Sequence, residues 1–119
     1  MESYKLFDAE YKFMSLVWDH EPVNSTELVK LSNTVLGWKK STTYTVLRKL
    51  CERGFLRNDA ATVTTLVKKE AVQKQESESL VQKTFGGSLP QFLTAFLGGR
   101  KLSAQEAEEL KRIIEEAEE

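Results

Sequence analysis

The stretch from Trp38 to Leu56, WKKSTTYTVLRKLCERGFL, constrains the fold of this chain more than any other segment. Leu47, Leu50 and Cys51 recur at helical spacing and predict an apolar stripe. Gly54 then supplies a C-terminal helix stop. The first turns carry basic or small hydrogen-bonding side chains instead, namely Lys39, Lys40, Ser41, Thr42, Thr43 and Thr45. The sequence therefore predicts a helix that is anchored along one side and rich in donors along the other.

Such a helix has the properties that a protein needs to read the major groove of DNA. Its apolar stripe holds it on the protein, while its polar turns can reach base edges and phosphates. The alternative is an ordinary solvated helix face. Trp38 leaves a similar choice open, because an indole at this point can pack beneath the helix or touch a sugar-phosphate. The stretch alone favours neither interpretation.

The neighbouring segments place this helix in a larger pattern. We expect Asp8 to be the N-cap of a first helix that runs to about His20, and Asn24, which opens a capping-box sequence, to be the N-cap of a second. After the third helix, Phe55–Arg57 and the β-branched run Thr62–Val67 predict two short strands around a turn. Three helices followed by a two-stranded hairpin is the order of a winged helix. In that fold the third helix enters the major groove and the hairpin lies over the DNA backbone or the minor groove.

The C-terminal part predicts further helices. We expect a mainly α protein with a small β hairpin, in which a winged helix-turn-helix DNA-binding domain spans residues 1–67 and a helical dimerisation domain spans residues 68–119. Ser88 and Ser103 are expected to cap the last two helices. These helices are too apolar to hide their faces on each other, so we expect them to pair with a second copy of the chain. The alternative is that they fold back on the N-terminal domain. The expected interface residues are Leu89, Phe92, Leu93, Phe96, Leu97, Leu110, Ile113 and Ile114.

Composition argues against several function classes. The chain has one cysteine, Cys51, and one histidine, His20, which leaves no internal disulfide and no thiolate metal cluster. Without a second histidine, a thiol pair or a Gly-rich phosphate loop, we expect neither an enzyme nor a bound cofactor or metal. No apolar run approaches the roughly 20 residues of a membrane span. The N-terminus lacks a basic-then-apolar signal pattern, so we expect a cytoplasmic protein without membrane insertion.

The overall charge of −1 conceals an asymmetry along the chain. Between Trp38 and Arg57, six basic residues face one acid, Glu52, which gives a net charge of +5. From Gln105 onward, seven glutamates face two basic residues, which gives −5. Local field rather than net charge steers a polyanion. A nucleic-acid partner is therefore compatible with this composition.

Three segments resemble the penicillinase-repressor (BlaI/MecI/CopY) family of bacterial transcriptional regulators. They are AEYKFMSLVWDHEPVNSTELVKLSN, GWKKSTTYTVLRKLCERGFL and ESESLVQKTFGGSLPQFLTAFLGGRKLSAQEAEELKRII. The last is the most specific, because generic winged helices do not carry such a tail. The resemblance implies a homodimeric repressor whose winged helices read the two halves of a palindromic operator in double-stranded DNA. The alternative is a winged-helix protein–protein interaction module that does not bind DNA.

The resemblance also implies roles for individual residues. Ser41, Thr42 and Thr45 match positions from which family members contact bases or phosphates. The hairpin, called the wing in this fold, departs from the family pattern, because Asp59-Ala60-Ala61 stands where relatives have a basic, Gly-containing tip. The full set expected to contact DNA is Lys39, Lys40, Ser41, Thr42, Thr43, Thr45, Arg48, Thr62 and Thr64.

A release mechanism is implied as a hypothesis. In family members that answer β-lactams, a membrane sensor-protease pathway cuts within the helix after the paired glycines. The matching bond here is Ala95–Phe96, where related repressors have Asn-Phe. The phenylalanine is kept and the asparagine is not.

Overall fold

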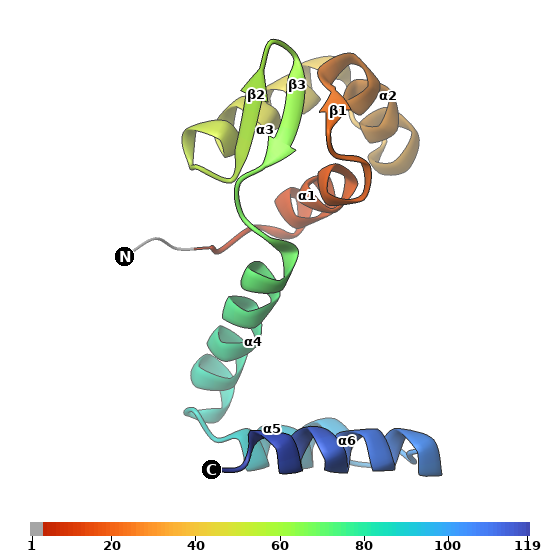
Figure 1. The fold of residues 1–119 in the computed structure, drawn as a ribbon, viewed down its shortest axis with the longest axis vertical. Helices are drawn as coiled ribbons and strands as arrows, with labels where there is room; N and C mark the ends of the chain where they lie inside the picture. Colours follow the sequence, from red (N-terminus) through yellow and green to blue (C-terminus); the bar gives the residue numbers. More distant parts are fainter. Residues whose placement is uncertain (1–3) are drawn as a thin grey trace. The chain divides into compact units, whose positions relative to one another are not determined.

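The computed structural model describes residues 4–119, and these contain six helices and three short strands (Figure 1). The helices are α1 (Asp8–His20), α2 (Ser25–Leu36), α3 (Lys40–Glu52), α4 (Lys69–Phe85), α5 (Leu89–Leu97) and α6 (Ala104–Ala117). The strands are β1 (Val23–Asn24), β2 (Leu56–Asp59) and β3 (Thr62–Thr65). The predicted class, mainly α with a small β element, is confirmed. None of the described helices is long and apolar enough to cross a membrane.

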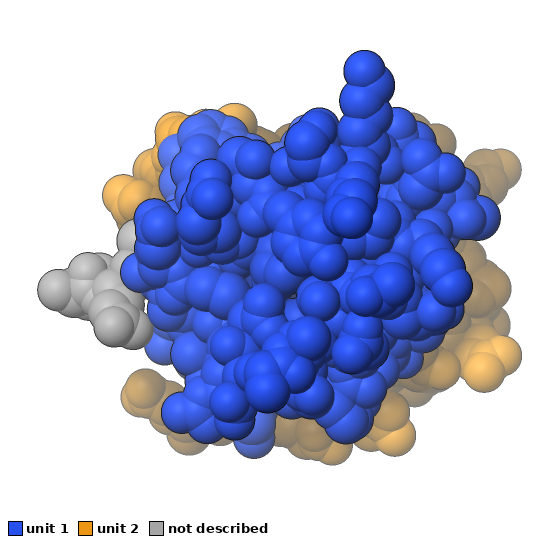
Figure 2. Space-filling model, turned by 90° about the horizontal axis from the view of Figure 1, so that it is seen from above, with its two compact units in different colours: residues 1–79 blue, residues 80–119 orange. Residues whose placement is uncertain are grey.

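The chain divides into two compact units, residues 1–79 and residues 80–119 (Figure 2). Val72 of α4 is completely buried in the core of the first unit. The first turns of α4 therefore pack with that unit. The predicted domain boundary between residues 67 and 68 stays a prediction.

The core of the first unit joins all of its elements. Five of its side chains are at most 1% exposed: Phe13 of α1, Leu28 of α2, Leu50 of α3, Val63 of β3, and Phe55, which precedes β2. Each fully buried side chain of this kind stabilises the fold by roughly 1.5–3 kcal/mol relative to an exposed one. Within this core α3 packs against β2, and α1 packs against β3 (Figure 1). The burial of these side chains fixes which side of α3 faces outward.

The N-cap of the first helix differs from the expectation. Its N-cap is Phe7 rather than Asp8, and phenylalanine has no side-chain acceptor to offer. Glu10 makes the cap instead, since its carboxylate accepts a hydrogen bond from the Phe7 N–H at 2.9 Å. Asp8 lies in the first turn, where a negative charge is favourable toward the helix dipole.

The three other predicted caps are confirmed. Asn24 Oδ1 accepts a hydrogen bond at 2.8 Å from the backbone N–H two residues later, at the start of α2. The Oγ atoms of Ser88 and Ser103 accept from the backbone N–H three residues later, at 3.2 Å and 3.1 Å. Each bond satisfies one of the unpaired donors of the first helical turn.

The sheet contains three strands, whereas the sequence predicted two. The strand order is β1-β3-β2, and both pairs are antiparallel. In β1, Val23 pairs with Val63 and Asn24 pairs with Thr62. A strand of two residues is too short to show an alternating pattern, so periodicity gave no sign of it.

The turn between β2 and β3 has two residues, Ala60 and Ala61, whose φ angles are 50° and 70°. Positive φ at both positions is the geometry of a type I′ hairpin, which favours Asn-Gly because a Cβ is disfavoured there. The two alanines leave the tip of the wing without a basic side chain and without the glycine that this turn favours.

An ion pair connects the end of α3 to the start of α1. Arg53 Nη1 lies 3.1 Å and 3.2 Å from the two carboxylate oxygens of Glu10. Arg53 Nη2 donates to the Lys5 carbonyl, and the guanidinium carbon lies 4.8 Å from the centre of the Phe55 ring. The Glu10 side chain is only 8% exposed. Arg53 is therefore committed to the structure of the first unit.

Arg53→Gln is expected to lower the free energy of unfolding by about 2 kcal/mol or more, measured by urea denaturation. The reason is that the substitution removes the charged partner of the buried Glu10 carboxylate. Arg57→Gln is the matched control, because Arg57 is exposed and has no ion pair with another described residue. It should cost less than about 0.5 kcal/mol. Equal costs for the two variants would contradict this role of the ion pair.

Candidate nucleic-acid interface

One face of α3 presents polar side chains to solvent. Ser41, Thr42, Thr45, Arg48 and Lys49 are all exposed. Ser41, Thr45 and Arg48 follow the spacing i, i+4, i+7, which places them on one side of a helix. The Thr45 hydroxyl donates to the Ser41 carbonyl at 2.9 Å, so its oxygen remains available as an acceptor. This face can offer a guanidinium donor and hydroxyl groups to the edges of base pairs.

The opposite side of α3 holds the helix in the core, and it includes Thr43. Thr43 and Leu50 are 0% exposed and Leu47 is 2% exposed. The Thr43 hydroxyl donates to the Lys39 carbonyl at 3.1 Å. Thr43 was expected to contact DNA, but its side chain is buried and cannot reach a ligand. The signal was in the sequence, because Thr43 precedes Leu47 by four residues and Leu50 by seven.

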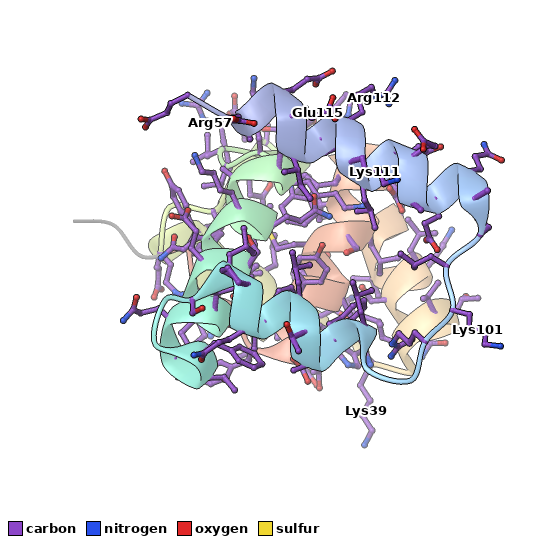
Figure 3. All side chains as sticks on the ribbon, turned by 90° about the horizontal axis from the view of Figure 1, so that it is seen from below. Lys39, Arg57, Lys101, Lys111, Arg112 and Glu115 are labelled. Atoms are coloured by element: carbon purple, nitrogen blue, oxygen red, sulfur yellow. The ribbon has the colours of Figure 1, made fainter. Side chains whose placement is uncertain are left out.

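The start of α3 concentrates positive charge. Lys39 is the N-cap residue and Lys40 is the first helical residue; both are exposed, and the Lys39 side chain extends away from the ribbon (Figure 3). No side chain among residues 4–119 caps this helix start. Unpaired N–H groups at a helix start attract anions, and the two ammonium groups add to this field.

The charge available for a polyanion is smaller than the sequence count suggested. Arg53 is paired with Glu10, so its charge is already balanced by a carboxylate of the same unit. The remaining basic residues of the segment are exposed and form no ion pair with another described residue: Lys39, Lys40, Arg48, Lys49 and Arg57.

Trp38 packs under the start of α3. Its ring stacks on Phe13 with a centroid distance of 5.5 Å and an interplanar angle of 16°. The backbone N–H of Trp38 donates to the Ser32 carbonyl, and the backbone carbonyl of Trp38 accepts from Asn33 Nδ2 at 3.1 Å. Gly37 permits the turn by adopting a φ of 71°. Of the two possibilities that the sequence left for Trp38, the structure shows packing against the core. These contacts fix the position of α3 relative to α2.

The wing offers a modest set of groups. Thr62 is exposed and pairs with Asp59, so an acid lies beside it at the tip. Thr64 is half-buried and pairs with Arg57. Arg57 is exposed, and the expected contact set omitted it although the charge count included it. Its charge and its position on β2 make Arg57 a better candidate for a phosphate contact than Thr62 or Thr64.

The second unit carries the apolar side chains expected at a dimer interface. Leu89, Phe96, Ile113 and Ile114 are 52–57% exposed. Phe92, Leu93, Leu97 and Leu110 are half-buried. Within α5 and α6, both wholly described, no side chain is completely buried. Other α6 positions carry charged groups such as Lys111, Arg112 and Glu115 (Figure 3). The two helices thus leave apolar surface open.

Aromatic contacts organise α5. Phe92 lies 5.6 Å from Phe85 and 5.8 Å from Phe96, measured between ring centroids. The Arg100 guanidinium carbon lies 4.7 Å from the centre of the Phe96 ring. The Ala95–Phe96 bond lies within the helix, and both residues are exposed.

Comparison with known proteins gives consistent matches. The sequence matches the penicillinase repressor family over residues 6–116. The penicillinase repressor of Bacillus licheniformis is 27% identical over 116 residues, which cover 94% of this chain and 91% of that protein. The methicillin resistance regulatory protein MecI of Staphylococcus aureus (strain Mu50 / ATCC 700699) is 22% identical over 117 residues, which cover 95% of each chain.

Two solved structures share the fold. The DNA binding domain of the repressor BlaI has a TM-score of 0.50 and 24% identity, covering 58% of this chain and 90% of that one. The monomeric form of Bacillus licheniformis BlaI in complex with the blaP half-operator also has a TM-score of 0.50 and 24% identity, covering 59% and 92%. The predicted winged-helix fold is confirmed.

Thr43→Ala is expected to be less stable than Thr42→Ala by about 1–2 kcal/mol, measured by urea denaturation at one protein concentration. The gain in helix propensity from alanine is common to both variants, so the difference reports the buried position of Thr43. Equal stability of the two variants would mean that α3 is rotated relative to the arrangement described.

Proposed function

Because this chain belongs to the penicillinase repressor family, we propose that it represses transcription by binding a specific DNA operator as a homodimer. The family consists of transcriptional repressors rather than enzymes. The observation that carries the proposal is the outward face of α3, where hydroxyl and guanidinium groups are exposed on a helix anchored from behind. That arrangement suits a helix that enters the major groove.

Two kinds of contact divide the work of binding. Ser41, Thr42, Thr45 and Arg48 read base edges or the phosphates beside them, and a good bidentate base contact discriminates by roughly 1–3 kcal/mol. Lys39, Lys40, Lys49 and Arg57 contact phosphates and release condensed counterions, which makes affinity fall steeply with salt. Apart from Arg57, the wing adds little, because its tip is Asp59-Ala60-Ala61. The relative BlaI, solved with a half-operator, supports this use of the fold.

Dimerisation raises the affinity for the operator further. The exposed apolar side chains of α5 and α6 match the same surface on a second copy, which is the arrangement of a two-fold interface. Each winged helix then reads one half of a palindromic operator. Joining two weak modules raises the affinity through effective concentration, by about 100-fold or more.

Release follows from proteolysis of the second unit by a membrane sensor-protease pathway. The Ala95–Phe96 bond is helical, so a protease needs α5 to unwind locally before the bond can enter its active site. Phe96 is 52% exposed, so its side chain is accessible to a protease once the helix has unwound. Cleavage there separates α6 from the rest of the chain and weakens the dimer on which operator affinity depends.

Thr42→Ala is expected to weaken binding to the operator beside the protein's own gene by about tenfold, and binding to random DNA far less. The measurement is fluorescence anisotropy at one salt concentration. Thr84→Ala, an exposed threonine of α4, is the control and should leave both affinities unchanged. Equal losses on both DNAs would remove the base-reading role of Thr42. Binding that is absent or independent of salt would favour a protein-interaction module instead.

The double substitution Ile113→Glu and Ile114→Glu is expected to convert the dimer into a monomer and to lower operator affinity by about 100-fold. Sedimentation velocity and anisotropy measure the two effects. Arg112→Glu changes the net charge by the same −2 on the same helix and should leave the dimer intact. A dimer that survives the isoleucine substitutions would show that the interface lies elsewhere.

A further inference from the structure

A pocket of about 500 Å³ lies in the first unit between α3 and the hairpin. Its apolar lining includes Leu47 and Leu56, which are almost fully buried, and Cys51, which is half-buried. Leu66, directly after β3, also lines it and is 54% exposed. The volume falls within the range of about 300–1,000 Å³ that is typical of small-molecule sites. An exposed leucine beside such a hollow is apolar surface without a partner.

The charged groups of this pocket are cationic, and Tyr44 and Asn58 add neutral polar groups. Arg48 and Arg57 line it, and none of the described residues in its lining is acidic. Neither guanidinium forms an ion pair with another described residue. Burial is the main cause that raises the pKa of the Cys51 thiol; a backbone hydrogen bond with Asn58 opposes it, and the negative charge of Glu52 adds to it. An apolar hollow beside two unpaired guanidinium groups is complementary to an apolar molecule that carries a carboxylate or a similar anion.

We propose that this pocket binds a small apolar organic anion, and that the bound anion competes with DNA for Arg48. The anionic group pairs with Arg48 and Arg57, while the apolar part covers Leu66 and Cys51. Arg48 belongs both to the pocket and to the outward face of α3. One guanidinium pairs fully with only one anion at a time, so the ligand and the DNA lower each other's affinity by the same factor. The competition rests on the proposed repressor function, whereas the binding of the anion does not.

Cys51 gives a direct readout of occupancy, because it is the single cysteine of the chain. Burial raises the pKa of its thiol, so the folded protein should react slowly with iodoacetamide. Decanoate, used as the probe, is expected to slow this alkylation further and in a saturable way. Unfolding by the probe would speed alkylation, so the direction of the change separates binding from denaturation. 1-Decanol, which has the same chain without the charge, should bind at least about tenfold more weakly.

Leu66→Gln tests whether the protection arises in this pocket. Leu66 is outside the set proposed to contact DNA, so this variant should bind operator normally and lose most of the protection by decanoate. Leu80→Gln changes another exposed leucine, in α4, and should keep the protection. Lack of protection in the unmodified protein, equal protection by 1-decanol, or equal behaviour of the two variants would overturn the proposed site.

Operator binding in the presence of decanoate tests the competition. Saturating decanoate should weaken operator binding by the unmodified protein and have little effect on Leu66→Gln. Protection of Cys51 without any change in operator affinity would overturn the competition and leave the site. A protein that binds no operator even without decanoate would instead refute the proposed repressor function, and the alkylation assay would still decide whether the site exists.

Discussion

The burial of one side of α3 is the constraint on which the rest of the structure depends. Thr43, Leu47 and Leu50 are held in the core, and the Trp38–Phe13 stack fixes where the helix starts. A helix has only one rotation that buries this stripe. The same contacts therefore decide that Arg48 and the hydroxyl groups of Ser41 and Thr45 face outward. Core packing thereby determines which side chains form the proposed recognition surface, and the side chains of that surface have little part in stabilising the fold.

The positive charge near this helix serves two separate purposes. Arg53 is committed to Glu10 and ties the end of α3 to α1, while the other basic residues of the segment face solvent without ion pairs to described residues. Only charges without a fixed partner can replace counterions on DNA, so Arg53 is not expected to add to the affinity for DNA. It also explains why Arg48 and Arg57 are available to an anion that is not DNA, in the pocket next to the same helix.

The sequence predicted those features that depend on local pattern. The caps at Asn24, Ser88 and Ser103, the order of helices and the fold class all follow from capping chemistry and periodicity. The N-cap at Phe7 escaped prediction because the capping group is a side chain three residues later. The strand β1 escaped because two residues carry no periodicity, and its pairing with β3 is set by tertiary contact. Arg53 had no local signal of its partner, 43 residues away. Thr43, in contrast, was misassigned although its spacing to Leu47 and Leu50 was visible.

Cutting DNA from the outward face of α3 would test whether this face enters the groove. An iron–EDTA group would be attached to the thiol introduced by Thr45→Cys, in a chain whose own thiol is removed by Cys51→Ser, and strand breaks would be mapped on the operator. We expect two clusters of breaks whose centres lie about 34 Å apart, or a multiple of that distance, one in each half of the site. Breaks spread evenly along the DNA, or no breaks on DNA to which the labelled protein is shown to bind, would mean that this face of α3 does not enter the groove.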